Sequence, residues 1–376
     1  MESSLSLSQR QVLELLSAAL QNRAPKIELF AEMLAADWKA VEQLAQEQSI
    51  LGLVANRILS LPKELLPERQ HRLELALTEE LITRHYKAYN KALKVIYQEY
   101  EDRGLYPVML KGLTMSQLYP QPQLRSLGDL DLFLPQAGAY QRANDWVRSS
   151  GYPMEEPALY EQAYRRGKML VENHLYLTYF GIPKYDKALS SIVDTITAQD
   201  GWDYNTIEGT NYRVLPLELN AVYTFHHILH HFSYLGIGLR QICDWILIMQ
   251  RHSRQMDASL VEDYARQLDL MRPMQLFALM AVRHLGIAAD IFPFSLPQDK
   301  ESLRLADLII DDTFRGGNFG FEHFAGRSFS NIWSRRWFMF RRTTLRSLRV
   351  AEVSPEHIRM IPVIAIANRI KLLFKR

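Results

Sequence analysis

Two aspartates separated by one residue give the strongest chemical signal in the sequence. Asp129 and Asp131 alternate with leucines in the segment Ser-Leu-Gly-Asp-Leu-Asp-Leu, residues 126–132. On a β-strand, side chains two residues apart point to the same face, so these carboxylates would lie side by side. Neighbouring carboxylates repel unless a cation holds them together, and such a pair can bind Mg²⁺ ions that neutralise a triphosphate. An ordinary polar strand face is the alternative interpretation, because Asp-x-Asp alone is a weak motif.

A glycine-containing turn precedes this pair. Residues 108–113, Val-Met-Leu-Lys-Gly-Leu, predict a strand that runs into a helix through Lys111 and Gly112. Glycine at this junction exposes amides that favour bound phosphate, and Lys111 adds a positive charge. Gly128 permits close approach of a ligand to the backbone. These residues predict a nucleotide site, with Arg125 as a further phosphate contact or, alternatively, a surface arginine.

Residues 110–134 resemble the bacterial family of uncharacterised nucleotidyltransferases, within the polymerase-beta-like nucleotidyltransferase superfamily. The matching features are a Leu-Lys-Gly helix start, a Tyr-Pro segment, an arginine and Gly-Asp-x-Asp. They fall at residues 110–112, 119–120, 125 and 128–131. Thinner similarities continue at the acidic-x-His stretch 171–174, at the helical stretch from His230 through Arg240 to Asp244, and at 317–320.

The resemblance implies a small mixed sheet with three carboxylates, in which Asp129 and Asp131 bind metal and Glu172 is the third. Glu172 would hold a metal or act as a base toward the attacking hydroxyl; its alternative is a strand residue paired with an arginine. His174 shares a strand face with Glu172 and is expected to contact nucleotide, to hold Glu172, or to be a structural histidine. With two Mg²⁺ or Mn²⁺ ions at these carboxylates, the implied reaction moves NMP from an NTP such as ATP to an unknown acceptor, and pyrophosphate leaves.

Two departures from the superfamily pattern motivate an alternative function. The usual Gly-Ser of the phosphate-binding turn is Lys111-Gly112 here, and the usual third aspartate is Glu172. A catalytically degenerate protein of the same fold would bind nucleotide or a partner without turnover.

Four histidines need a separate interpretation. His226, His227, His230 and His231 form two i,i+4 pairs, a spacing that can bind zinc. Because no His-Glu-x-x-His glutamate and no nearby cysteine completes a zinc site, packing of one histidine against the α/β region is favoured. Arg240 and Asp244 are also four residues apart and predict an ion pair on the next helix.

The elements that would position these residues predict an α+β fold, with a small mixed-sheet nucleotidyltransferase core flanked by helical regions. Four regions are expected: N-terminal helices (1–104), the nucleotidyltransferase core (105–215), a C-terminal helical domain (216–320) and a basic aromatic tail (321–376). Apolar periodicity predicts strands at 106–110, 130–134 and 169–179. The same periodicity predicts helices at 9–20, 27–35, 73–100, 112–119, 136–149, 217–232, 239–251, 260–268, 273–285 and 302–312.

Composition excludes several classes of protein. Apolar residues make up 48% of the 376, enough for a substantial core, which favours a folded chain over a disordered one. One cysteine cannot form an intramolecular disulfide. No run reaches the roughly 20 apolar residues of a membrane span, and no secretory signal is recognisable. We therefore expect a cytoplasmic protein.

The net charge of +2 hides a basic end. Residues 315–376 carry 13 Lys+Arg against 3 Asp+Glu. This asymmetry predicts nucleic acid or a membrane surface as an anionic partner. The favoured alternative is an amphipathic helix around 333–349 whose aromatic residues dock on the acidic body of the protein itself.

Overall fold

The structure is a computed structural model that describes residues 5–156, 158–317 and 331–374. Within these residues the chain forms a six-stranded mixed sheet with the order β3-β4-β2-β1-β6-β5. The strands are β1 (Val108–Leu110), β2 (Leu130–Phe133), β3 (Glu161–Arg166), β4 (Met169–His174), β5 (Asp203–Ile207) and β6 (Thr210–Val214). The central strand β2 runs antiparallel to β1 and parallel to β4, so Asp131 lies opposite Glu172.

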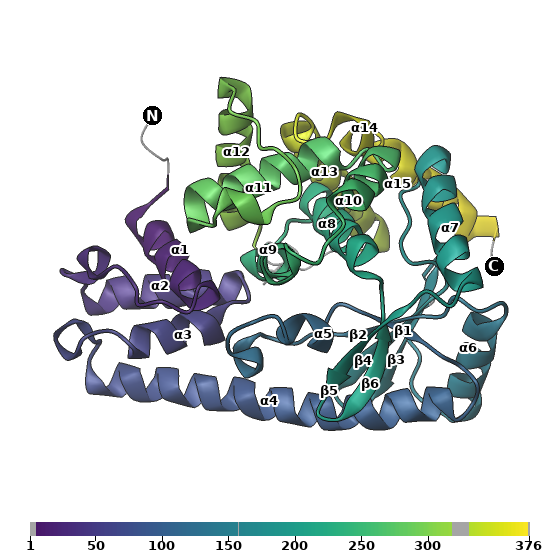
Figure 1. Cartoon of the computed structure of the whole chain (residues 1–376), viewed down its shortest axis with the longest axis horizontal. Coiled ribbons are helices and arrows are strands. Elements are labelled where there is room, and N and C mark those ends of the chain that lie inside the picture. The colour runs from purple at the N-terminus through teal and green to yellow at the C-terminus, as the bar shows by residue number, and fades with distance from the viewer. Residues whose placement is uncertain (1–4, 157, 318–330, 375–376) are drawn as a thin grey trace.

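A single long helix joins the N-terminal helices to the sheet. In Figure 1, α4 runs along the base of the molecule, from below the N-terminal helices to below the sheet. Its 33 residues span about 50 Å. The N-terminal helices are α1 (Leu7–Leu20), α2 (Ala35–Glu47) and α3 (Leu51–Leu59), with the short 3₁₀ turns η1 (Ile27–Phe30) and η2 (Lys63–Leu65); α4 itself is Arg69–Glu101.

Further helices lie around the sheet. The C-terminal helices lie over the face of the sheet opposite α4, which we call its second face (Figure 1). Around the sheet lie α5 (Leu113–Ser116), η3 (Pro122–Leu124), α6 (Ala139–Ser149) and α7 (Pro183–Ala198). The C-terminal helices are α8 (Leu217–Tyr234), α9 (Leu239–His252), α10 (Ala258–Gln267), α11 (Met271–Leu285), η4 (Ala289–Ile291), α12 (Lys300–Gly316), α13 (Ile332–Val350), α14 (Pro355–Ile358) and α15 (Ile361–Phe374).

The central strand β2 is buried on both faces, although its alternation of apolar and acidic residues is typical of a strand with one buried face. Leu130 and Leu132 pack in a cluster with residues of α4 and α6, whereas Phe133 belongs to the larger cluster that includes α8. All four residues of β2 are buried. Because the C-terminal helices cover the second face, the side chain of Asp131 is removed from bulk solvent.

The helix predicted at 27–35 is wrong. Residues 27–30 form the 3₁₀ turn η1, and α2 begins only at Ala35. The backbone N–H of Leu34 donates to the Asp37 carboxylate at 2.8 Å, which starts a new helix after Leu34. The strand predicted at 169–179 ends earlier, at His174, and the helix predicted at 112–119 is limited to α5.

The structure confirms an α+β fold, but the sequence did not resolve all of its elements. β3, β5, β6 and α7 lie inside the region that was predicted only as mixed α/β. The two edge strands, β3 and β5, are largely polar, so they give no apolar alternation to detect. The four region boundaries stay a prediction.

The basic tail contains the expected helix, α13, and it docks on the body of the protein. Arg346 and Arg349 both form ion pairs with Asp312 of α12, and Arg346 Nε donates to the Phe232 carbonyl at 2.7 Å. Trp337, by contrast, is 66% exposed. Val350 of α13 is fully buried in the hydrophobic core, so the tail docks through arginines and apolar residues together. Residues 318–330, which include most of the 317–320 motif and the start of the tail, lie outside the described residues.

None of the helices in the described ranges is both long enough and apolar enough to cross a bilayer.

Asp312 is fully buried between two arginines, so its removal is expected to loosen the tail. Asp312→Ala should lower the free energy of unfolding by about 3–5 kcal/mol, because Arg346 would be left without its partner in a buried site. Urea denaturation measures this loss. The matched change on the same helix, Asp311→Ala, removes a pair with the exposed Arg315 and should stay below about 1 kcal/mol. Equal effects of the two substitutions would contradict the prediction.

Candidate functional site

A cavity of about 510 Å³ lies over the β2–β4 part of the sheet, on the side covered by α8. Strands β2 and β4 supply Asp131, Glu172 and His174 to its wall, and the turn after β1 supplies Lys111. From α8, Tyr223, His227 and His231 also line it. The predicted residues Gly112, Arg125, Gly128 and Asp129 line the same cavity, so tertiary structure brings the whole predicted set together.

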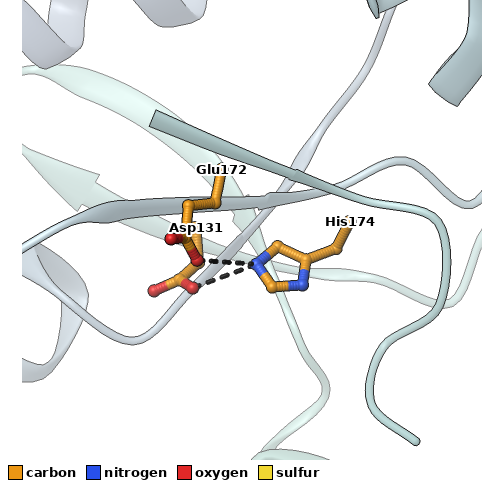
Figure 2. A group of neighbouring side chains, drawn as sticks. All are labelled: Asp131, Glu172 and His174. Atoms are coloured by element: carbon orange, nitrogen blue, oxygen red, sulfur yellow. Dashed lines mark hydrogen bonds and ion pairs between the residues drawn. The ribbon is translucent and has the colours of Figure 1, made fainter. Parts of the chain in front are cut away.

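Asp131, Glu172 and His174 form a compact group that could hold a metal ion (Figure 2). One ligand atom from each lies within 4.8 Å of the others. His174 Nε2 is 3.0 Å from Asp131 Oδ1 and 3.7 Å from Glu172 Oε2. Asp129 was expected in this group; it lies before β2, exposed to the cavity, and in this arrangement His174 completes the set of three instead.

The Lys111–Gly112 turn directs a lysine at these carboxylates. Lys111 and Gly112 both have positive φ, 51° and 62°, which is a strained conformation for lysine and an accessible one for glycine. Lys111 Nζ lies 3.4 Å from Asp131 Oδ1 and 3.3 Å from His227 Nδ1. Strain of this kind concentrates at functional sites, where the surrounding structure holds it in place.

The three acids of the site differ in the direction and size of their pKa shifts. Burial acts to raise the pKa of Asp131, but Lys111 and His174 oppose it and lower this pKa to about 2. Burial, together with the charges of Asp131 and Asp129, raises the pKa of Glu172 to about 8. The neighbouring Asp131 charge raises the pKa of Asp129. Without a cation, the site therefore holds a proton on Glu172 at neutral pH.

The Asp131 carboxylate favours the charged forms of the two basic groups of the site. Burial acts to lower the pKa of Lys111 and of His174, but the Asp131 carboxylate dominates in both cases and raises each pKa. Below its raised pKa, His174 donates a hydrogen bond to Asp131. To serve as a metal ligand, it must first release that proton.

The histidine cluster packs against the α/β region, as expected. His227 contacts Lys111, and His226 Nδ1 lies 3.1 Å from Thr178 Oγ1. Burial lowers the pKa of His226, His227, His230 and His231, so the cluster stays neutral at physiological pH. The neutral imidazoles therefore add no positive charge that would repel the Lys111 ammonium or a bound cation.

Side chains of α9 and α4 form hydrogen bonds and an ion pair with the loop that leads into β2. Arg125 forms a bidentate ion pair with Asp244 of α9, with Nε–Oδ1 at 2.8 Å and Nη2–Oδ2 at 2.6 Å. Arg240, for which a pair with Asp244 was predicted, donates to the Ser126 carbonyl at 3.0 Å. From α4, the Tyr89 hydroxyl donates to the Asp129 carbonyl at 2.9 Å. The Arg125 guanidinium therefore already has a protein carboxylate as its partner.

Several residues of the site were missed by sequence reasoning. Tyr89 and Tyr223 come from segments that carry no recognisable motif. Tyr119 was noticed only as part of the Tyr-Pro segment, and its hydroxyl donates to Asp244 at 2.7 Å. A Cβ added at Gly128 would meet no described atom within 4 Å, so the backbone there is open to a ligand.

Comparisons with known proteins point to the same family as the sequence motifs of the site. A family model described as "Uncharacterised nucleotidyltransferase" matches residues 35–286, which include β1 to β6 and the histidine helix α8. No curated protein matches the chain. The crystal structure of an antigenic nucleotidyltransferase-like protein from Paracoccidioides brasiliensis is similar over 52% of this chain and 91% of that one, with 15% identity and a TM-score of 0.30. At that TM-score, the likeness adds nothing to the family match.

Binding of a divalent cation is expected to depend on pH, because the proton on Glu172 must leave. With the pKa of Glu172 at about 8, affinity should rise as pH increases toward 8 and level off above it. Calorimetric titration with Mn²⁺ in buffers of different ionisation enthalpy measures both affinity and released protons. Glu172→Gln should bind more weakly and show a flatter pH profile. Binding with no proton released at neutral pH would contradict the prediction.

The Arg125–Asp244 pair is expected to be structural, since the two side chains are only 5% and 6% exposed. Arg125→Met should lower the free energy of unfolding by about 3–5 kcal/mol, because Asp244 would stay buried without its partner. The double variant Arg125→Met, Asp244→Leu should recover part of that loss. Denaturant unfolding measures the stability of both variants. If Arg125→Met is as stable as the parent protein, the Arg125–Asp244 pair is not structural.

Proposed function

Because the chain belongs to the uncharacterised nucleotidyltransferase family, we propose that it transfers an NMP group from an NTP to an acceptor, with a divalent cation at its carboxylates. The observation that carries the proposal is the meeting of Asp131, Glu172 and Lys111 in one cavity, with Asp129 beside them. Both charges needed for a metal–triphosphate complex are thus present: acids for the cation and a lysine for the phosphates.

The donor set fits a hard divalent cation. Carboxylate oxygens are the ligands that Mg²⁺ and Mn²⁺ prefer, and Asp131, Glu172 and Asp129 would hold the ion. The raised pKa of Glu172 supports this assignment, because mutual repulsion of the acids is relieved by a positive ion. When bound, such an ion neutralises triphosphate charge and favours in-line displacement. Mg²⁺ is the expected ion; the nitrogen of His174, were it a ligand, would favour Mn²⁺.

In the proposed reaction, the acceptor hydroxyl attacks the α-phosphorus of the NTP. A new oxygen–phosphorus bond forms, the bond from the α-phosphorus to the bridging oxygen breaks, and pyrophosphate leaves. Lys111 lies where it can bind phosphate oxygens. Glu172, once deprotonated, can either hold the ion or accept the proton of the attacking hydroxyl. His174 fixes the orientation of Asp131 through their hydrogen bond.

A second candidate function is nucleotide binding without turnover. It is favoured by the ion pair between Lys111 and Asp131, since this lysine already neutralises the acid that would hold the cation. Such a protein would be stabilised thermally by NTP and would release no pyrophosphate. Measurable turnover would exclude it.

The catalytic proposal is tested by incubation with labelled NTPs, Mg²⁺ or Mn²⁺ and cell extract, followed by detection of labelled product and pyrophosphate. Asp129→Ala and Asp131→Ala should each reduce the rate by at least about a hundredfold, because a metal-binding carboxylate contributes several kcal/mol to stabilising the transition state. The control Asp145→Ala, an exposed aspartate of α6, should keep full activity. Activity that persists in both site variants would reject these assignments.

A further inference from the structure

Three tyrosines gather at one end of the cavity, beyond the metal-binding group. Tyr160 directly precedes β3, and Tyr176 and Tyr179 follow β4. The two segments are joined where the Leu175 N–H donates to the Tyr160 carbonyl at 2.9 Å. The ring of Tyr160 lies 4.4 Å from that of Tyr179 and 5.3 Å from that of Tyr176, measured between centroids. We call these three residues the tyrosine cluster.

The tyrosine cluster presents aromatic surface to the cavity. All three residues line it, and Tyr176 is 49% exposed although it packs against Tyr160. Neighbouring rings fix Tyr160 from two sides, so the cluster is a prearranged surface. An exposed ring held in this way offers its face to a planar ligand.

The cluster is joined to the metal-binding group through the strands themselves. Glu161, next to Tyr160, places Oε2 3.8 Å from His174 Nδ1, and Tyr176 is two residues beyond His174. A ligand that fills the cavity therefore contacts both ends of it.

The two ends of the cavity differ in charge. Lys111, Asp131, Glu172 and His174 make one end charged. At the other end, residues 158–160 and 176–179, which line the cavity, are aromatic, aliphatic or threonine; the adjacent Glu161 is charged and lies toward His174. The charged end suits phosphates, and the aromatic end suits an uncharged ring system.

We propose that the tyrosine cluster is the surface on which the base of the nucleoside triphosphate stacks while its phosphates lie at Lys111 and the carboxylates. This inference rests on the proposed function, since it assumes that an NTP occupies the cavity. Every base has a π-face, so stacking on tyrosine tolerates different bases. The cluster therefore contributes affinity for nucleosides in general.

The test compares two ligands that differ in the base: a nonhydrolysable ATP analogue and inorganic tripolyphosphate, each with Mn²⁺. Tyr176→Ala should weaken binding of the ATP analogue by about tenfold or more and leave binding of tripolyphosphate unchanged. Tyr176→Phe keeps the ring and should bind both ligands like the parent. The matched control Tyr204→Ala, an exposed tyrosine on the edge strand β5, should change neither affinity. Analogues of GTP, CTP and UTP should show losses similar to that of ATP.

The outcomes separate this inference from the proposed function. If Tyr176→Ala binds the ATP analogue as tightly as the parent, or loses both ligands equally, the tyrosine cluster does not hold the base, even though NTP binding stands. A change confined to the KM of an acceptor would likewise overturn it. If the parent protein binds neither the ATP analogue nor tripolyphosphate, the proposed function fails and this inference fails with it.

Discussion

The site depends on one electrostatic constraint, the confinement of neighbouring carboxylates in one cavity, where Asp131 is buried and Glu172 is partly buried. Asp131 and Glu172 are held in register by two adjacent parallel strands, so they cannot move apart. Their repulsion is balanced from within by Lys111 and His174 and by a proton on Glu172. A divalent cation would replace that proton. Carboxylates held together in a buried site repel one another, which costs stability. The same repulsion favours the binding of a cation between them.

The helices around the sheet maintain this constraint. The C-terminal helices cover the carboxylate-bearing face, and burial strengthens every charge interaction in the cavity. Tyr89 of α4 and Asp244 of α9 hold the loop before β2 from two sides. The flanking helical regions thus belong to the site and do not merely border it. The hydrophobic cluster that includes Phe133 also contains residues of α1, α3 and α8, so the regions share a core.

The basic end of the chain has an internal role that its composition alone does not reveal. Two of its arginines neutralise the buried Asp312, and a third, Arg342, donates to the Leu235 carbonyl at 3.3 Å. Part of the positive charge that suggested an anionic partner is therefore engaged with the protein itself. The helix α13 docks through these arginines and through the buried Val350, while Trp337 stays exposed.

The sequence by itself determined the α+β class, the long helix that became α4, the Lys111–Gly112 turn and the pair Asp129 and Asp131, because each depends on local periodicity or on residues adjacent in the chain. It did not determine the polar edge strands β3 and β5, which lack alternation. Only tertiary structure decided that Arg125 pairs with Asp244, that His174 completes the candidate metal-binding group, and that three tyrosines meet beside it. Those relations join residues up to 119 positions apart, and their distances follow from strand register and helix packing, which local residue patterns do not encode.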